Sequence, residues 1–241
     1  TSGFLIMKFV QETTAPKPDE RPKHSLLSNY GYAFQSKPIR IALGIMLISQ
    51  VSVFMIQPIF ALFVESLVSN TEYIATMAGA IFSVVGVFTV ISAPWWGKRN
   101  DVKSYKKNLS IALFGAGISY AAQGLVINPY QLIFFRATLG FCLGGMLPTL
   151  YSYVSKNSIL ERRGGIMGIA SSFNILANMI GPPAGGFIAA HIGLRQNFFI
   201  TGGFLMLAVV FVRLFFIDMR ENQDLAAGAS EQVERAVTLE E

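Results

Sequence analysis

The sequence contains little charge and few of the residues that build catalytic or metal sites. Asp, Glu, Lys and Arg make up 14% of the 241 residues, well below the roughly 25% of soluble domains. The single cysteine, Cys142, excludes an intramolecular disulfide. The two histidines, His24 and His191, lie in separate polar segments without ligand spacing around them, so we expect neither a metal site nor a cofactor. Since 52% of the residues are hydrophobic, the composition indicates a polytopic membrane protein.

Six long apolar runs carry most of this hydrophobicity. Each is near the roughly 20 residues that a helix needs to cross the hydrocarbon core. The runs are continuous and lack the two-residue alternation of a lipid-facing strand, so they predict helices and an all-α fold. The predicted spans are residues 41–64, 73–96, 109–127, 130–153, 165–190 and 198–217.

Acidic residues are absent from the core of every predicted span. The nearest ones, Glu65, Glu72, Asp101 and Asp218, lie close to span ends. The spans also hold no histidine–carboxylate pair for acid–base chemistry and no Ser-His-Asp set, so we do not expect an enzyme. A proton-driven carrier needs a membrane carboxylate or a comparable relay, and this chain shows none in its spans.

Basic residues are concentrated in alternate loops. Residues 93–107 contain Lys98, Arg99, Lys103, Lys106 and Lys107, whereas residues 65–72 and 128–129 contain no Lys or Arg. Because Lys and Arg are retained on the cytoplasmic side during insertion, both termini of a multi-pass chain in the cell membrane are predicted to be cytoplasmic. We read the net charge of +5 as this orientation signal, and therefore expect no nucleic-acid partner.

The remaining segments divide the chain into four parts. Residues 1–10 predict the end of a truncated preceding helix, and residues 11–38, which are polar and rich in proline, predict a flexible cytoplasmic linker. Residues 39–217 form the predicted six-helix bundle, and residues 218–241 a polar cytoplasmic tail. Pro58 and Pro148 are 90 residues apart, and Pro94 and Pro182 are 88 apart. These offsets favour two inverted three-helix repeats, as in secondary transporters.

Three motifs resemble those of the major facilitator superfamily. The loop signature of that family, a glycine followed by an aspartate and basic residues, is similar to Gly97, Asp101, Lys103, Lys106 and Lys107. Leu132, Arg136, Gly140 and Gly144 resemble its arginine-bearing fourth-helix motif. Gly181, Pro182, Gly185 and Gly186 resemble the Gly-Pro-x-x-Gly-Gly motif of its drug:proton antiporter branch.

The resemblance implies the carboxyl-terminal half of a twelve-helix carrier. Val102 and Ser104 depart from the family's arginine and glycine, a degeneracy more usual in the second half than in the first, although an amino-terminal half stays open. The implied function is half of a proton-coupled multidrug efflux antiporter that works by alternating access. The implied partners are small apolar or cationic drugs, protons, the lipid bilayer and the missing six-helix half. A facilitator or importer of a small metabolite and a non-transporting six-helix scaffold are the alternatives.

Candidate residues for a substrate cavity lie on three spans. Gln50, Phe54 and Gln57 share one helix face at i, i+4 and i+7, and Asn174 and Asn178 share another. These amides either line a cavity or bond neighbouring helices. Arg136 lies inside the fourth span, where a charge costs about 2.5 to 3.5 kcal/mol. It therefore either points into the cavity or extends to the outer interface.

Two further groups are predicted to act through shape or position. The resemblance implies that residues 97–107 form a gating loop, while a local helix cap is the alternative for Asp101. Gly181, Pro182, Gly185 and Gly186 predict a smooth, bent helix face. At such a contact a methyl group is often tolerated and an isobutyl group is not, so Gly185→Ala is expected to be mild and Gly185→Leu harmful.

Overall fold

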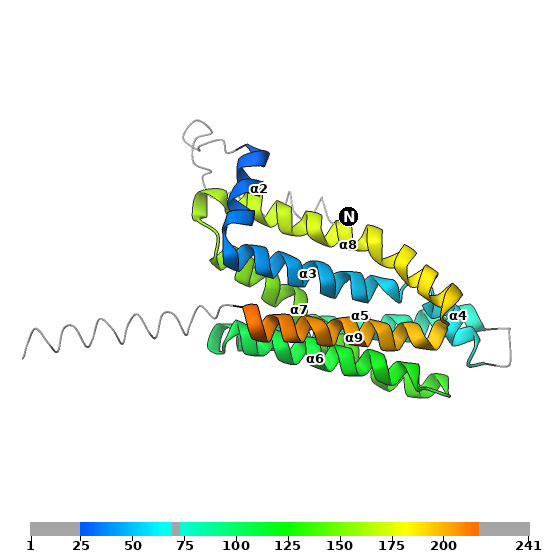
Figure 1. Cartoon of the computed structure of the whole chain (residues 1–241). Coiled ribbons are helices and arrows are strands. Elements are labelled where there is room, and N and C mark those ends of the chain that lie inside the picture. The colour runs from blue at the N-terminus through cyan, green and yellow to red at the C-terminus, as the bar shows by residue number, and fades with distance from the viewer. Residues whose placement is uncertain (1–24, 69–72, 217–241) are drawn as a thin grey trace, which may run out of the picture.

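The computed structural model describes residues 25–68 and 73–216, and the elements within these ranges are helices (Figure 1). The predicted helix end at residues 1–10 and the predicted tail at 218–241 lie outside them. The helices are α2 (Leu26–Gln35), α3 (Lys37–Met55), α4 (Phe60–Glu65), α5 (Ile74–Val102), α6 (Tyr105–Gly124), α7 (Pro129–Lys156), the short 3-10 helix η2 (Leu160–Arg162), α8 (Arg163–His191) and α9 (Leu194–Phe215).

Five of these helical segments are long and apolar enough to cross a membrane: Lys37–Met55, Ile74–Val102, Pro129–Lys156, Leu160–His191 and Leu194–Phe215. The all-α class and the multi-pass character are thereby confirmed. The six-span count is not, because α6 falls short of the required hydropathy. Its polar side chains are turned inward: Asn108, Ser119 and Gln123 are buried, while Ile111 and Phe114 are exposed. A helix whose polar groups are covered by neighbours needs fewer apolar residues than one surrounded by lipid.

Two segments are more helical than the sequence predicted. Residues 26–35, assigned to the flexible linker, form α2, which packs beside α3 and α8. Residues 97–102, assigned to the gating loop, continue α5, which contains Pro94 without interruption. The linker prediction is therefore wrong for residues 26–35, and only residues 103 and 104 separate α5 from α6.

The first predicted span is broken in the middle. Residues 56–59, which include Pro58, form turns between α3 and α4. Proline removes a backbone donor and crowds the preceding turn, which accounts for the interruption at this position. The carbonyl of Phe54 accepts from the amide of Gln57 at 3.3 Å, so the helix ends in a tighter turn.

The helices pack side by side in one bundle: α3 runs parallel to α8 and α5 parallel to α7, whereas α6 runs antiparallel to α9 (Figure 1). The most extensive contacts join α5 with α7, α6 with α9, and α3 with α8. Glycines allow close approaches: a Cβ on Gly117 would lie 3.2 Å from the carbonyl oxygen of Gly202, and a Cβ on Gly140 would meet the backbone of Val85. Small residues bring helix backbones together in membranes, where apolar packing in general gives little preference for a neighbour over lipid.

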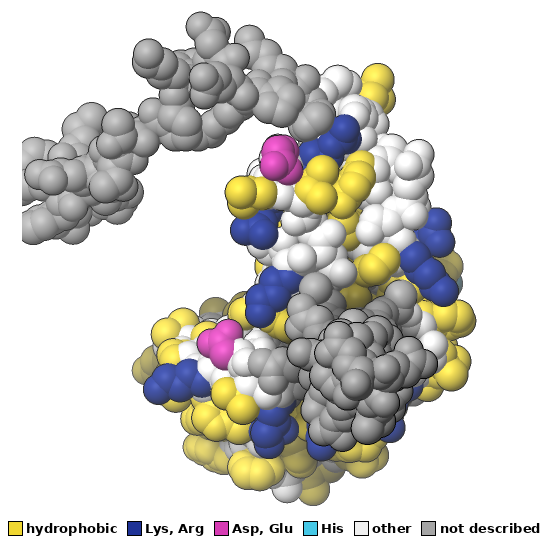
Figure 2. All heavy atoms as spheres, turned by 90° about the vertical axis from the view of Figure 1, so that its left-hand side faces the viewer, with side chains coloured by type: hydrophobic (Ala, Val, Ile, Leu, Met, Phe, Trp, Pro, Cys, Tyr) yellow, Lys and Arg dark blue, Asp and Glu magenta, His cyan; other side chains and the backbone are white. Residues whose placement is uncertain are grey.

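Charge is distributed unequally between the two ends of the bundle. Of the Lys and Arg residues that the structure describes, all but Arg136 and Arg195 lie at the end that contains the start of α3, the α5–α6 turn, the α7–α8 connection and the end of α9. Figure 2 shows Lys and Arg side chains spread over this end with few acidic side chains among them. We call it the basic end.

Candidate substrate cavity

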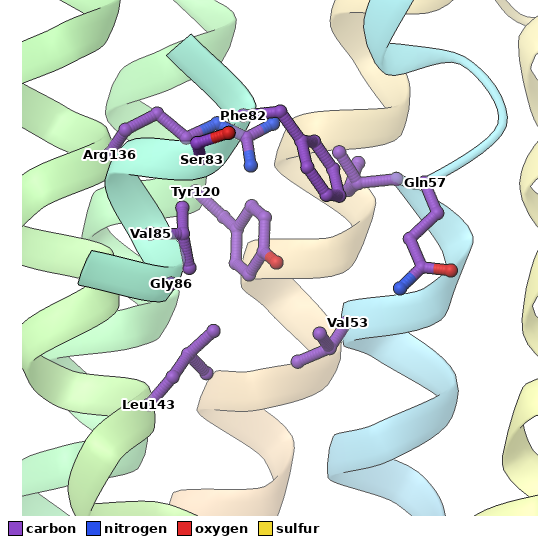
Figure 3. Close-up of a pocket in the computed structure, with 10 residues that line it drawn as sticks. Val53, Gln57, Phe82, Ser83, Val85, Gly86, Tyr120, Arg136 and Leu143 are labelled. Carbon is purple, nitrogen blue, oxygen red and sulfur yellow. The ribbon is translucent and has the colours of Figure 1, made fainter. Parts of the chain in front are cut away.

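A cavity of about 330 Å³ lies between α3, α5, α6 and α7 (Figure 3). Its lining is mostly apolar, with one arginine, one tyrosine, one amide and one hydroxyl among ten side chains. The residues are Val53, Ile56, Gln57, Phe82, Ser83, Val85, Gly86, Tyr120, Arg136 and Leu143. Apolar walls with a few polar groups are the usual composition of a small-molecule site.

Arg136 is the charged residue of this cavity and is 3% exposed. It lies on α7, and its guanidinium carbon stands 3.5 Å from the ring centre of Phe60 on α4 and 5.3 Å from that of Phe82 on α5. The two rings lie 5.5 Å apart. An arginine over an aromatic face is attracted by the ring quadrupole, an interaction worth about 2 kcal/mol when desolvated.

This aromatic support does not satisfy the hydrogen-bonding groups of Arg136. Its Nε and Nη2 atoms are buried without a hydrogen-bond partner among the described residues. A guanidinium carries five N–H donors, and leaving a charged donor unpaired costs about 1 to 3 kcal/mol or more. Arg136 therefore does not extend to the interface as the alternative prediction had it, and it retains unused capacity to donate to an acceptor in the cavity.

The predicted amide residues do not all meet at this cavity. Gln57, in the turn after α3, is among the lining residues, but it is exposed and its side chain runs along α3 (Figure 3). Gln50 is buried at 3% exposure but is not among the lining residues. Phe54 packs against α8, where a Cβ on Gly181 would lie 2.5 Å from the Cβ of Phe54. The predicted face of Gln50, Phe54 and Gln57 is thus divided by the helix end at Met55.

The two asparagines of α8 lie elsewhere. Asn178 is exposed, and Asn174 is half-buried with its Oδ1 lacking a partner among the described residues. Neither residue lines the cavity around Arg136. Their part in a substrate site stays a prediction.

Three lining or supporting aromatic residues were not predicted from the sequence. Phe60 follows the proline break by two residues, Phe82 lies on α5, and Tyr120, 2% exposed, projects from α6 into the cavity (Figure 3). The sequence contains 20 phenylalanines, so no spacing distinguishes these two. The polar group of Ser119, Tyr120 and Gln123 within a mostly apolar span was an available signal.

The predicted gating residues lie at the basic end on a hydrogen-bonded helix junction. Arg99 Nε donates to Asn108 Oδ1 at 2.9 Å, and Asn108 Nδ2 donates to Asn100 Oδ1 at 2.8 Å. Asn100 Nδ2 in turn donates to Thr149 Oγ1 at 2.7 Å. This chain of bonds joins α5, α6 and α7, and a fully satisfied buried network specifies one arrangement of its helices.

The helix-cap alternative for Asp101 stays a prediction. Asp101 lies in the last turn of α5, and the residue that caps α6 is Ser104, whose hydroxyl accepts from the backbone amide of Lys107 at 3.3 Å. Gly97 lies within α5, and a Cβ there would meet nothing within 4 Å. Lys103 alone of the predicted gating residues lies outside a helix.

The Gly-Pro cluster forms a contact within this bundle. A Cβ on Gly185 would collide with the backbone carbonyl of Met55 at the end of α3, whereas one on Gly186 would meet nothing within 4 Å. The Gly185 carbonyl also accepts from Asn197 Nδ2 on α9 at 2.8 Å. The expectation that Gly185→Ala is mild is therefore wrong, because backbone atoms cannot rotate away as a side chain does.

Comparison with known proteins decides the family. Residues 8–239 match the family profile of the Major Facilitator Superfamily. The chain belongs to the major facilitator superfamily. Among individual proteins of this superfamily, it is 34% identical over 157 residues to multidrug resistance protein MdtG of Escherichia fergusonii, a match that covers 65% of this chain and 38% of that protein.

Further relatives give the same result. The multidrug resistance protein MdtG of Proteus mirabilis is 34% identical over 164 residues, covering 68% of this chain and 40% of the relative. That of Salmonella paratyphi A is 32% identical over 169 residues, covering 70% and 41%. The matched part thus spans about two fifths of the length of these relatives. The chain is a member of a transporter superfamily with a multi-pass membrane fold, which confirms the resemblance stated from its motifs.

Proposed function

We propose that this chain supplies half of a proton-coupled multidrug efflux antiporter that works by alternating access. The observation that carries the proposal is Arg136, a buried cation with unused donors in an aromatic cavity inside a membrane bundle. A charge at this depth costs about 2.5 to 3.5 kcal/mol, so ionisable residues in spans are by default functional candidates. The relatives, whose names describe multidrug resistance, support the drug-like substrate class.

The cavity favours a substrate with an apolar body and one hydrogen-bond acceptor. Phe60, Phe82 and Tyr120 provide aromatic area, and Arg136 provides unpaired donors. A cationic group, which the resemblance of the motifs had implied as an option, gains nothing beside Arg136, because none of the residues that line this cavity is acidic and two cations repel. A neutral or electron-rich drug therefore fits the lining better than a cation.

The second half of the carrier is proposed to cover α5 and α8. Buried residues make up 11% of the most apolar stretch of α5 and 28% of that of the Leu160–His191 segment, which contains α8. The corresponding share for α3 is 50%. These two helices have few buried residues, and the chain matches only about two fifths of the length of its relatives. A second six-helix unit is therefore the proposed partner. The proton site is assigned to that unit, because the described spans of this chain hold no carboxylate in their cores.

The proposed topology has six spans as two inverted three-helix units in the cell membrane, with the basic end in the cytoplasm. The distribution of Lys and Arg supports this orientation, because loops rich in these residues are retained in the cytoplasm. Both predicted terminal segments attach to the same basic end. The antiparallel pairing of α6 with α9 supports α6 as the remaining span.

Substitution of Arg136 tests the proposal. In the full-length protein, Arg136→Leu is expected to lower drug efflux by about tenfold or more, because a hydrogen bond to a charged group contributes about 1.5 to 3 kcal/mol. Arg195→Leu is the matched control: Arg195 also lies near a phenylalanine ring, 5.9 Å from Phe63, but outside the cavity. Efflux is measured in cells and normalised to the amount of inserted protein.

Two outcomes contradict the proposal. Efflux by Arg136→Leu equal to that of the wild type removes Arg136 from the substrate site. An equal loss for Arg136→Leu and Arg195→Leu assigns the effect to general destabilisation instead of the cavity.

A further inference from the structure

A second cavity, separate from the one around Arg136, lies at the basic end between α6 and α9. Its volume is about 280 Å³, and it is lined by Ser104, Lys106, Lys107, Ser110 and Arg213. Three of these five side chains are cations, contributed by the first turn of α6 and the last turn of α9, and none is acidic. Two antiparallel helices thus bring positive charge together at one point.

The cations of this pocket have no partner among the described residues, so they can bind an anion. Within residues 25–68 and 73–216, the side chains of Lys106, Lys107 and Arg213 make no hydrogen bond or ion pair with another residue. The two serines are used locally: the Ser104 hydroxyl accepts from the Lys107 amide at 3.3 Å, and the Ser110 hydroxyl donates to the Lys106 carbonyl at 2.8 Å. The pocket therefore keeps three unneutralised cations beside hydroxyl groups that already have partners.

Exposed apolar residues continue from the pocket along both helices. On α6, Ile111, Phe114 and Ile118 follow Lys107 at four, seven and eleven residues, so they share its helix face. On α9, Val210 and Leu207 precede Arg213 at three and six residues. These five side chains are 41% to 51% exposed in a bundle that spans the membrane.

We propose that this pocket binds the headgroup of an anionic phospholipid, whose acyl chains lie along the apolar faces of α6 and α9. The charge of the pocket is complementary to a lipid phosphate, and the apolar stripe begins about one helical turn beyond the cations, at Ile111 and Val210. Basic pockets between membrane helices commonly hold lipid headgroups. A soluble phosphate uses the cations but gains nothing from the exposed phenylalanine and aliphatic side chains, which is why a lipid fits better.

Native mass spectrometry of the full-length protein tests this site. The protein is released from a bilayer made of equal parts phosphatidylcholine and phosphatidylglycerol, and the lipids that remain bound are counted. We expect the wild type to retain phosphatidylglycerol in preference to phosphatidylcholine. The triple variant Lys106→Gln, Lys107→Gln, Arg213→Gln is expected to lose this preference by about tenfold or more, because each cation near an anionic lipid surface contributes roughly fivefold.

Two control variants separate a site from general surface charge. Lys37→Gln, Lys98→Gln, Arg163→Gln removes the same charge from exposed positions at the same end that do not line the pocket, and it is expected to keep the preference. Lys106→Arg, Lys107→Arg, Arg213→Lys retains the charge of the pocket and is also expected to keep it.

Several results overturn the proposal. One is a wild type without preference for phosphatidylglycerol, and another is an equal loss in the two glutamine variants. Loss of binding in the charge-retaining variant excludes electrostatic recognition. Displacement of the bound lipid by inorganic phosphate identifies a free-anion site in place of a lipid site.

Discussion

Gly185 offers a sharp test of how closely α8 approaches α3. The perturbation is the addition of one methyl group, Gly185→Ala, at a point where a Cβ would collide with the backbone carbonyl of Met55. Gly186 provides a matched control one residue away, since a Cβ there meets nothing within 4 Å. The two variants have the same composition and differ only in where the methyl group lies.

The expected magnitudes follow from these two environments. Extra atoms in a packed contact typically cost about 1 to 3 kcal/mol, and a backbone neighbour gives less relief than a side chain. The displacement also strains the hydrogen bond from Asn197 Nδ2 to the Gly185 carbonyl, which is 2.8 Å long. In contrast, alanine in place of glycine within an open helix position stabilises by up to about 1 kcal/mol, because the unfolded chain loses freedom.

Thermal unfolding of the full-length protein in one detergent measures the difference. We expect Gly185→Ala to lower Tm by several degrees and Gly186→Ala to leave it unchanged or slightly higher. Gly185→Leu is expected to prevent accumulation of folded protein. If Gly185→Ala and Gly186→Ala unfold at the same temperature, the close contact between α8 and Met55 does not exist and the reasoning is refuted.

Two other predictions concern the basic end and the orientation of the bundle. Asn108→Leu leaves Arg99 Nε and the side-chain oxygen Oδ1 of Asn100 without these partners, so we expect a loss of about 1 to 3 kcal/mol in unfolding free energy. The double variant with Asn100→Leu should cost less than the sum of the two single variants, and strict additivity contradicts a shared network. Single cysteines at Leu125 and Leu160, which are 70% and 73% exposed at opposite ends, should differ in labelling by an impermeant reagent outside sealed cells. Labelling of Leu160→Cys and not of Leu125→Cys reverses the proposed topology.

The arrangement of spans was largely predictable because it depends on simple local quantities. Five of the six apolar runs correspond to long helices whose hydropathy suffices for a membrane span. The proline at position 58 was noticed as part of a repeat, but its consequence was not predicted. Pro94, Pro148 and Pro182 lie inside continuous helices, so proline alone does not show which helix breaks.

The site was predictable only at its charged residue. Arg136 stands out because a cation inside an apolar run is costly, and this cost is visible in the sequence. Its neighbours Phe60 and Phe82 come from residues 76 and 54 positions earlier in the chain, and the sequence does not reveal such contacts. Likewise, Gly185 and Gly186 appear equivalent in sequence, and only the position of Met55 distinguishes them.

The break at residues 56–59 gives the first span a mechanical property that a continuous helix lacks. No unbroken ladder of helical hydrogen bonds passes from α3 to α4, so α4 is a separate helical piece of six residues. Its aromatic contacts include those of Phe60 with Arg136 and with Phe82, and that of Phe63 with Phe198, whose ring centres are 4.5 Å apart. A tilt of α4 about this hinge would move Phe60 relative to Arg136 while leaving α3 intact. Such a tilt would move the end of the span that faces away from the basic end together with the aromatic support of Arg136.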